Sequence, residues 1–430
     1  MIRLLYNLLF PLALLVFLPG YTLKMLRRGN YRDHFGQRLG LYDRATRRRL
    51  AAHPHTWMHA VSVGEVMLAL KLMRRMKEDE PSLRVALTTT TTTGFALARR
   101  EAPEWMEVLY TPLDFWPVMR RAFAVIRPVR IILVEAEVWP NLAALARRRK
   151  IPFALVNARL SPRSERRFRK FKRVVRPFFR MLDLICVQEP EDVARWESLG
   201  VDPARIELVG SIKFDPEGVD PRPEHPRAVL SALGIDPARP ILLGGSTHPG
   251  EEEILARVFQ QLRESCPDLF LIIAPRHVER AKEIATRLRA AGLQVASRSE
   301  PVETPAADCL LLDTTGELRN WYAVATIVFI GKSLTAHGGQ NPVEAIVADR
   351  PVLFGPHMEN FARLAQSLVR TGGAFQPNDE ASLTTTARTL LHDAGLRAQL
   401  VQQARGVLQP HRGATGRTAA LLRTLRAHAG

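Results

Sequence analysis

The sequence has few cysteines, and it lacks the common nucleotide-binding fingerprints. Cys186, Cys266 and Cys309 are its only cysteines in 430 residues and form no CxxC pair, which argues against a disulfide framework and a structural zinc site. No glycine-rich stretch has the spacing G-x-G-x-x-G or the ending G-K-[ST], so neither a dinucleotide fingerprint nor a P-loop is present. With 46% hydrophobic and 24% charged residues, disordered, collagen-like and multi-pass membrane proteins are excluded.

Acidic side chains are also scarce relative to basic ones. The chain has 61 Lys and Arg against 43 Asp and Glu, a formal charge of +18 at pH 7. A surface this basic is typical of proteins with an anionic partner. Nucleic acid, anionic lipid head groups and phosphorylated small molecules all fit, and charge alone does not separate them.

An apolar stretch opens the chain. Between residues 4 and 23 only Asn7 is strongly polar, and about 20 residues are enough to cross a bilayer. Pro11 and Pro19 leave a kinked span and an interfacial helix both open, and a buried helix of the first domain is the third alternative. The cationic residues follow the stretch, so we expect residues 1–24 to anchor a body that lies in the cytoplasm.

The rest of the chain alternates short β-branched runs with longer amphipathic stretches, the pattern of parallel sheets covered on both faces. The expected strands are 56–62, 84–90, 130–137, 153–159, 184–188 and 206–211, then 240–247, 269–276, 309–314, 326–333 and 351–356. Four prolines between residues 215 and 227 predict a linker. We therefore expect a Rossmann-like domain over 25–215, a linker over 216–230 and a second Rossmann-like domain over 231–430, whose last helix either stays there or packs back on the first lobe.

In the first lobe, acidic side chains follow two of the expected strands. Glu65 lies at a strand-to-helix turn three residues after Ser62, a spacing that fits both a capping box and a general base facing the cleft. Glu135 and Glu137 fall on one side of the strand 130–137, where two like charges are costly unless one of them is used. We expect one of this pair to be functional and the other to be a helix cap.

In the second lobe, polar groups that suit an anion follow the strands. Ser246 and Thr247 stand in GGSTHPGEEE at a helix N-terminus, and Arg276 and His277 follow the next strand. In GGQNPVEA, the order Asn341, Pro342, Glu344 predicts a helix start with Asn341 as its N-cap. Each motif alone could be structural, but the three together indicate phosphate and hydroxyl recognition.

The most basic stretch, residues 161–180, repeats Phe168, Phe171, Val175 and Phe178 at helical spacing among its charges. It predicts an amphipathic basic helix, either at an anionic membrane surface or with a merely solvated charged face. The expected acceptor or membrane contacts are Arg163, Arg166, Arg167, Arg169, Lys170, Lys172 and Arg173.

Taken together, these motifs resemble the 3-deoxy-D-manno-octulosonic acid (Kdo) transferases of Gram-negative lipopolysaccharide assembly. The resemblance rests on SVGE at 62, VEAEVWPNL at 134, NARLSPRS at 157, GSIKFD at 210, GSTHPGEEE at 245, APRHVER at 274, TTGEL at 314, GGQNPVEA at 338 and FGPHMENF at 354. Gln340 stands where the family commonly has His, and Lys332 where a second Gly is usual.

The resemblance implies a GT-B fold, with two Rossmann-like lobes facing across a cleft and an N-terminal membrane anchor. It implies that the domain over 25–215 binds the acceptor and that the domain over 231–430 binds the nucleotide sugar, CMP-Kdo. It implies inverting transfer of Kdo from CMP-Kdo to a lipid A precursor, with Glu65 as general base and Glu135 and Lys213 stabilising the transition state. The implied CMP contacts are Pro275, Arg276, Thr315, Gly316, Glu317, Asn341, Pro342, Val343 and Glu344, with Ser246 and Gly339 as further donor contacts.

The same resemblance places the enzyme on the cytoplasmic face of the bacterial inner membrane, in contact with its lipids. We expect no metal, no other cofactor, no nucleic acid and no obligate protein partner. Two alternatives stay open: a GT-B enzyme that uses another activated sugar, and a basic, non-catalytic nucleic-acid-binding protein.

Overall fold

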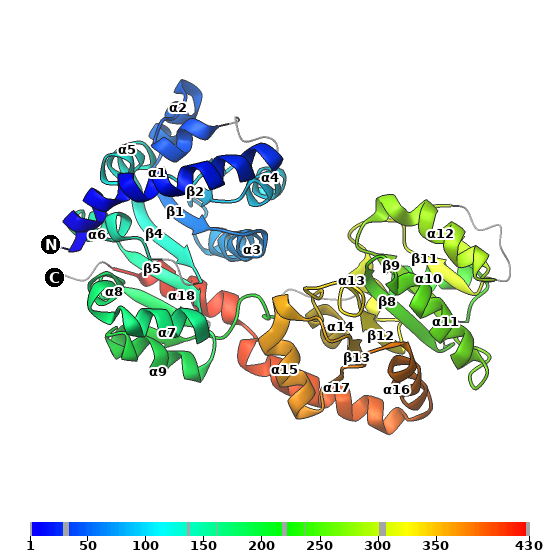
Figure 1. The fold of residues 1–430 in the computed structure, drawn as a ribbon. Helices are drawn as coiled ribbons and strands as arrows, with labels where there is room; N and C mark the ends of the chain where they lie inside the picture. The colour runs from blue at the N-terminus through cyan, green and yellow to red at the C-terminus, as the bar shows by residue number, and fades with distance from the viewer. Residues whose placement is uncertain are drawn as a thin grey trace. The chain divides into compact units, whose positions relative to one another are not determined.

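The computed structural model describes residues 2–28, 34–135, 138–160, 162–216, 222–236, 238–300 and 307–426. The chain forms two compact units (Figure 1). Unit 1 comprises Met1–Asp215 and Gly413–Gly430, and unit 2 comprises Pro216–Arg412. Part of the expected linker, residues 217–221, lies outside the described residues. Glu137 lies outside them as well.

Unit 1 is built on a seven-stranded parallel sheet of order β3-β2-β1-β4-β5-β6-β7. Its strands are β1 (His55–Ala60), β2 (Val85–Thr89), β3 (Met106–Tyr110), β4 (Pro128–Val134), β5 (Phe153–Ala158), β6 (Leu184–Val187) and β7 (Ile206–Leu208). Its helices are α1 (Ile2–Arg28), α2 (Arg44–Ala52), α3 (Val63–Asp79), α4 (Thr92–Glu101), α5 (Trp116–Ile126), α6 (Pro140–Arg148), α7 (Pro162–Lys170), α8 (Lys172–Phe179), α9 (Pro190–Ser198) and α18 (Ala414–Thr424).

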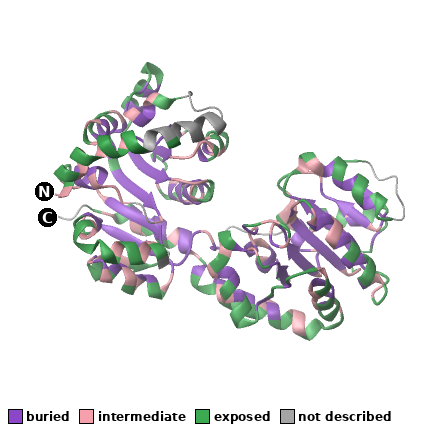
Figure 2. Cartoon of the chain, in the orientation of Figure 1, coloured by how far each residue is buried: buried purple, intermediate pink, exposed green. Residues whose placement is uncertain are grey.

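Both faces of this sheet are covered, so β1 is buried along its whole length (Figure 2). Successive side chains of a strand point to opposite faces. Trp57 accordingly packs with Phe123 of α5 in one hydrophobic cluster, whereas Met58 packs with Leu70 of α3 in the other. Burial on two sides therefore extends to the polar residues of this strand, His55, Thr56 and His59.

Unit 2 repeats the plan with a parallel sheet of order β10-β11-β9-β8-β12-β13-β14. Its strands are β8 (Ile241–Thr247), β9 (Phe270–Pro275), β10 (Val295–Ser297), β11 (Cys309–Leu311), β12 (Ile327–Ile330), β13 (Val352–Phe354) and β14 (Ala374–Phe375). Its helices are α10 (Glu224–Ala232), α11 (Glu251–Arg263), α12 (Ala281–Ala290), α13 (Leu318–Tyr322), α14 (Val343–Val347), α15 (Ala362–Thr371), α16 (Glu380–His392) and α17 (Ala394–Leu408).

Helix α18 belongs to unit 1, although unit 2 precedes it in the chain. The buried Asp215 accepts hydrogen bonds from the backbone N–H groups of Gly413 (2.9 Å) and Thr415 (2.8 Å) at the start of this helix. Arg130 of β4 donates to the carbonyl of Leu422 near its end, at 2.6 Å. We expected the second domain to run from 231 to 430, with its last helix staying there or packing back; α18 packs back, because these polar groups and a hydrophobic stripe hold it against α3.

Helix α1 contacts the rest of unit 1 through side chains of its first three turns. The side-chain amides of Asn7 and Asn141 donate to each other's oxygens at 2.9 and 3.0 Å, and Phe10 stacks on Phe115 with ring centroids 5.4 Å apart. None of the described helices combines the length and hydropathy that crossing a membrane requires. The apolar stretch is thus a helix, as expected, with one side docked on the lobe.

The basic stretch forms two helices where the sequence predicted one. Helix α7 ends at Lys170 and α8 begins at Lys172, because Phe171 between them has φ −103° and ψ 26°, outside the helical region. Pro177 inside α8 further removes a backbone donor. All seven predicted basic contacts are exposed; they are Arg163, Arg166, Arg167, Arg169, Lys170, Lys172 and Arg173.

Candidate active site

Glu65 lies in the first turn of α3, directly after the carboxyl end of β1. Its Oε2 accepts a hydrogen bond from the backbone N–H of Val61 at 2.9 Å, and its Oε1 accepts one from the Ser62 hydroxyl at 3.0 Å. Burial raises the pKa of Glu65 and the nearby charge of Glu135 adds to this, while the two hydrogen bonds act in the opposite direction. The result is a carboxylate held in place with a pKa above its usual value, which suits a general base.

One half of the predicted capping box at Glu65 is present in the structure. The Ser62 oxygen accepts from the backbone N–H of Glu65 at 3.4 Å, so Ser62 is the N-cap of α3. The carboxylate, however, reaches back to Val61 and not to the N-cap amide that a capping box uses. Glu65 therefore helps to begin the helix, and this contact does not exclude a chemical role.

Glu135 follows β4, the strand next to β1. It has a φ of +65°, a left-handed conformation that a residue with a side chain adopts at a cost of roughly 1–3 kcal/mol. The Arg159 guanidinium, just after β5, forms an ion pair with it at 2.9 Å between Nη2 and Oε2. Strain of this kind persists where the surrounding structure holds the side chain in a required position.

Lys213 lies five residues after the end of β7 and close to the same carboxylate. Burial lowers the pKa of its ammonium group, the charge of Glu135 raises it in part, and Arg159 lowers it again. Because the charge of Glu135 acts on both Glu65 and Lys213, the structure brings the three predicted catalytic residues together. They gather at the carboxyl edge of the sheet, where open α/β folds bind their ligands.

Two residues of this group had no role assigned from the sequence. Asn157 is buried with φ +50°, and its side-chain oxygen accepts from the Ser211 hydroxyl at 3.3 Å and the Ile212 amide at 3.0 Å. It thereby fixes the segment that carries Lys213. Arg159 pairs with Glu135. Both stand in NARL at the end of a strand, which was the available signal.

In unit 2 the residues after β8, β9 and β12 form a cationic group. Burial, together with the nearby charges of Lys332, His277, Arg280 and Arg276, lowers the pKa of His248 to about 4. The backbone N–H of Arg276 donates to the Thr247 carbonyl at 3.0 Å, which joins two of these loops. A cluster of positive charge around a neutral histidine can stabilise a phosphate or a carboxylate.

A buried carboxylate organises the loops of this cationic group. Glu251, the first residue of α11, has no exposed surface and accepts four backbone N–H bonds at 2.8–3.0 Å. The donors are the amides of His248, Lys332, Ser333 and Leu334. Lys332 has φ +58°, a left-handed conformation that glycine adopts more readily than a residue with a side chain.

Two of the remaining predicted donor contacts, Ser246 and Gly339, belong to these loops. Ser246 and Gly339 both have positive φ, and the Gly339 amide donates to the Lys332 carbonyl at 2.8 Å. Pro275 is buried at the end of β9, while Thr315 and Gly316 are exposed after β11. The pKa of Glu317 lies below its usual value. Burial raises this pKa, but hydrogen bonds from Thr314 and Trp321 and the charge of Arg298 lower it by more. The carboxylate of Glu317 is thus already engaged within unit 2.

The expected helix start at Asn341 differs from the structure by one residue. Helix α14 begins at Val343 with Pro342 at the cap position, and the Asn341 side chain accepts from the Val343 amide at 3.1 Å. Asn341 nevertheless accepts the hydrogen bond expected of an N-cap, from the amide two residues on, and Pro342 has helical dihedral angles, so the two starts differ only in the residue counted first. Glu344 in its first turn has a pKa raised by burial, although Arg319 opposes the shift.

The comparisons with known proteins agree on one family. A family model described as 3-deoxy-D-manno-octulosonic-acid transferase (kdotransferase) matches residues 33–216. The 3-deoxy-D-manno-octulosonic acid transferase of Haemophilus influenzae is 33% identical over 396 residues, 91% of each chain. The protein of the same name in Bordetella pertussis is 36% identical over 374 residues, 84% of this chain and 85% of the relative.

Solved structures are similar in fold at much lower identity. A glycosyltransferase from Rickettsia africae matches with a TM-score of 0.52 and 10% identity, over 86% of this chain and 98% of that one. The two parallel-sheet α/β units thus resemble those of GT-B glycosyltransferases. On the strength of its identity to full-length relatives, this chain belongs to the 3-deoxy-D-manno-octulosonic acid (Kdo) transferase family.

Proposed function

We propose that this chain is an inverting glycosyltransferase that moves Kdo from CMP-Kdo to a lipid A precursor in lipopolysaccharide biosynthesis. The observation that carries the proposal is its identity of 33% and 36% to Kdo transferases over most of both chains. The grouping of Glu65, Glu135 and Lys213 at one sheet edge supports it, because transfer to a sugar hydroxyl needs a base and stabilised charge.

In this proposal Glu65 takes the proton from the acceptor hydroxyl as its oxygen attacks the anomeric carbon of Kdo. Its raised pKa makes it a stronger base than an ordinary carboxylate, and the bonds from Val61 and Ser62 fix its direction. Lys213 and Glu135 form the charged surroundings of the reacting centre. The Arg159 pair holds Glu135 in its strained conformation.

The donor side of the reaction releases CMP, so negative charge develops on a phosphate oxygen. Arg276 and Lys332 are positively charged and stand beside the start of the loops that Glu251 fixes. They are proposed to stabilise the leaving phosphate. Pro275, Thr315, Gly316, Glu317 and the stretch Asn341–Glu344, with Ser246 and Gly339, complete the proposed donor site.

The experiment that tests this function is incubation of the purified chain with CMP-Kdo and a tetra-acylated lipid A precursor, followed by mass spectrometry of the lipid. We expect mass increments of Kdo, and their number gives the residues added. UDP-sugars serve as the competing donors; transfer from one of these and none from CMP-Kdo would favour the other GT-B hypothesis. Tight, salt-sensitive RNA binding without any transfer would favour the nucleic-acid hypothesis.

Arg276→Ala is expected to weaken CMP-Kdo binding by roughly 10- to 100-fold, because a hydrogen bond to a charged group contributes about 1.5–3 kcal/mol. Titration calorimetry measures this. Arg388→Ala, an exposed arginine on α16, is the matched control and should bind the donor like the wild type. An unchanged affinity of Arg276→Ala would remove this side chain from the donor site.

We also propose that unit 1 binds the cytoplasmic face of the inner membrane. Leu4, Leu8 and Leu15 of α1 are 76%, 70% and 65% exposed, which leaves an apolar strip on the side away from the docked Asn7 and Phe10. The exposed arginines and lysines of α7 and α8 supply positive charge on the same unit. Apolar insertion and attraction to anionic lipids together are typical of interfacial anchors.

Replacing Leu4, Leu8 and Leu15 together by serine is expected to reduce partitioning onto anionic vesicles by at least about 1000-fold, since three leucine side chains at roughly 1.5–3 kcal/mol each together contribute about 4.5–9 kcal/mol when fully removed from water. Vesicle co-sedimentation measures the partitioning. The matched control replaces three other exposed apolar residues of unit 1, Leu41, Val129 and Leu208, by serine. Equal binding by both triple variants would contradict an anchor at α1.

A further inference from the structure

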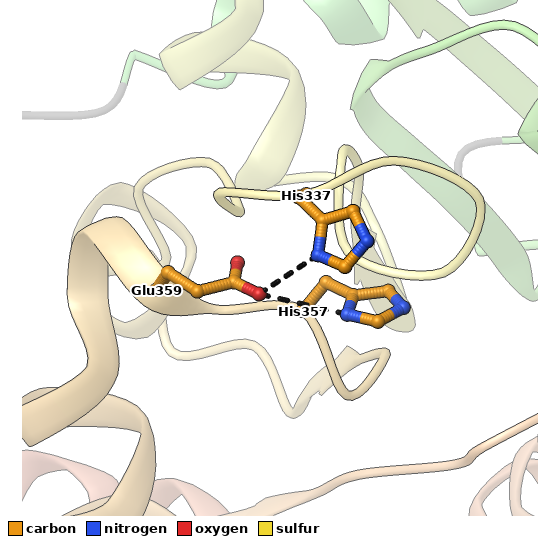
Figure 3. Close-up of side chains that lie close together, drawn as sticks. All are labelled: His337, His357 and Glu359. Atoms are coloured by element: carbon orange, nitrogen blue, oxygen red, sulfur yellow. Dashed lines mark hydrogen bonds and ion pairs between the residues drawn. The ribbon is translucent and has the colours of Figure 1, made fainter.

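Two histidines and a glutamate converge outside the proposed catalytic groups (Figure 3). His337 stands directly before the GGQNPVEA stretch, and His357 and Glu359 stand in the loop after β13. Glu359 Oε1 lies 3.0 Å from His337 Nδ1 and 3.6 Å from His357 Nδ1, as the dashed lines of Figure 3 mark. One ligand atom from each of the three lies within 4.8 Å of the other two.

These separations fit a single metal ion. Zinc binds imidazole nitrogen at about 2.0–2.1 Å and carboxylate oxygen at about 2.0–2.2 Å, which puts neighbouring ligand atoms about 3.3 Å apart in tetrahedral geometry. The two measured separations, 3.0 and 3.6 Å, lie on either side of that value. Two imidazoles and one carboxylate favour zinc and its transition-metal neighbours over Mg²⁺ or Ca²⁺, which prefer oxygen ligands.

The side chains are held in this arrangement by the backbone around them. The Gly338 amide donates to Glu359 Oε2 at 2.6 Å, so the second carboxylate oxygen is bound and Oε1 points to the histidines. The His357 amide donates to the Ser333 carbonyl at 2.9 Å, and the Asn360 amide donates to Gly338 at 2.9 Å. A ligand whose other atoms are already hydrogen-bonded needs little reordering when a metal binds.

The cluster is also open to solvent. The side chains of His337, Glu359 and His357 are 76%, 54% and 33% exposed. An ion could therefore enter without opening the fold, and three protein ligands would leave a fourth position for water or an anionic group.

We propose that His337, His357 and Glu359 form a binding site for a divalent transition metal, zinc by chemical preference. The ion would join the loop after β12 to the loop after β13. It would hold His337, two residues before Gly339 and close in sequence to the other proposed donor contacts, Asn341–Glu344. The ion would not take part in the transfer step. The sequence predicted no metal because the two histidines lie 20 residues apart, without any spacing typical of a zinc motif.

The test uses the untagged full-length protein after treatment with a chelator. Zinc is added in competition with a chromophoric chelator at pH 7.5. We expect one equivalent to bind and the melting temperature to rise. His337→Ala, His357→Ala and Glu359→Gln should each weaken binding by at least about tenfold, whereas the exposed His392→Ala should bind like the wild type.

The outcome is independent of the proposed transferase activity, because only zinc and the protein are measured. His337 and Glu359 are exposed and His357 is half-buried, so the single variants should fold; circular dichroism checks this. Binding of less than one equivalent to the wild type, or full binding by both single histidine variants, would overturn the site.

Discussion

Replacing Glu65 by glutamine is expected to lower the rate of Kdo transfer by roughly 10²- to 10⁴-fold, the usual contribution of a general base. Glutamine cannot accept the acceptor's proton at neutral pH. Its amide oxygen can still accept from the Val61 amide, and its amino group can donate to the Ser62 hydroxyl. Since glutamine also serves in capping boxes, the beginning of α3 should survive, and the variant separates the chemical role from the structural one.

The measurement is the initial rate of Kdo incorporation, with CMP-Kdo binding and melting temperature measured alongside. Donor affinity should stay within about twofold, since Glu65 lies in unit 1 and the proposed donor contacts lie in unit 2. Glu104→Gln, an exposed glutamate after α4, is the matched control and should transfer at the wild-type rate. Wild-type turnover by Glu65→Gln would reject the base assignment.

The pH profile of the wild type gives a second check on the same residue. The base works only when ionised, so the rate should fall as the pH drops through the pKa of Glu65. Burial raises that pKa, and the acid limb should therefore lie above the value of about 4.3 that is typical of a free glutamate. A limb at or below this value would mean that another group controls the rate.

The strands of the two sheets could be predicted from the sequence wherever burial on both faces made them continuous apolar runs. Three strands were missed: β3, β10 and β14. All three lie at the edge of a sheet. β10 and β14 are three and two residues long, too short to show a pattern in the sequence. β3 is almost wholly buried, so exposure at the edge does not account for its being missed.

The sequence predicted which candidate site residues follow the ends of strands, but it did not predict the contacts between these residues. Glu65 and Glu135 could be picked out as carboxylates after β1 and β4. That Arg159 pairs with Glu135, and that Asn157 fixes the segment of Lys213, depends on β5 lying between β4 and β6 in the sheet. Positive φ at Glu135 and Asn157 is likewise set by tertiary packing, since neither residue requires it.

The glutamate run after β8 shows the same limit. The sequence offers Glu251, Glu252 and Glu253 as three equal acids in the first turn of a helix. The structure gives them different surroundings: Glu252 pairs with Arg280, Glu253 pairs with Arg287, and Glu251 alone binds backbone amides of two loops. Only the position of β12 beside β8 makes Glu251 special.

Glu251→Gln is therefore expected to be the most damaging single change in unit 2. One side-chain oxygen becomes an amino group and faces two backbone N–H donors, which lose their acceptor in a buried site. Each unsatisfied buried donor costs about 1–3 kcal/mol, so we expect a loss of roughly 2–6 kcal/mol in the free energy of unfolding. Thermal and urea unfolding measure it.

Donor binding should fall with stability in this variant, because the amides that Glu251 holds belong to the same loops as His248 and Lys332. Glu253→Gln on the same helix α11 is the matched control: it weakens one half-exposed ion pair, with Arg287 of α12, and should cost no more than about 1 kcal/mol. If Glu251→Gln does not fold, Ser333→Ala is a milder variant of the same loop. It removes the hydroxyl that accepts a hydrogen bond from the Gly355 amide at 2.8 Å. Wild-type stability and donor affinity in Glu251→Gln would show that these loops keep their shape without the carboxylate, and the cationic group around His248 would then have to be organised by other contacts.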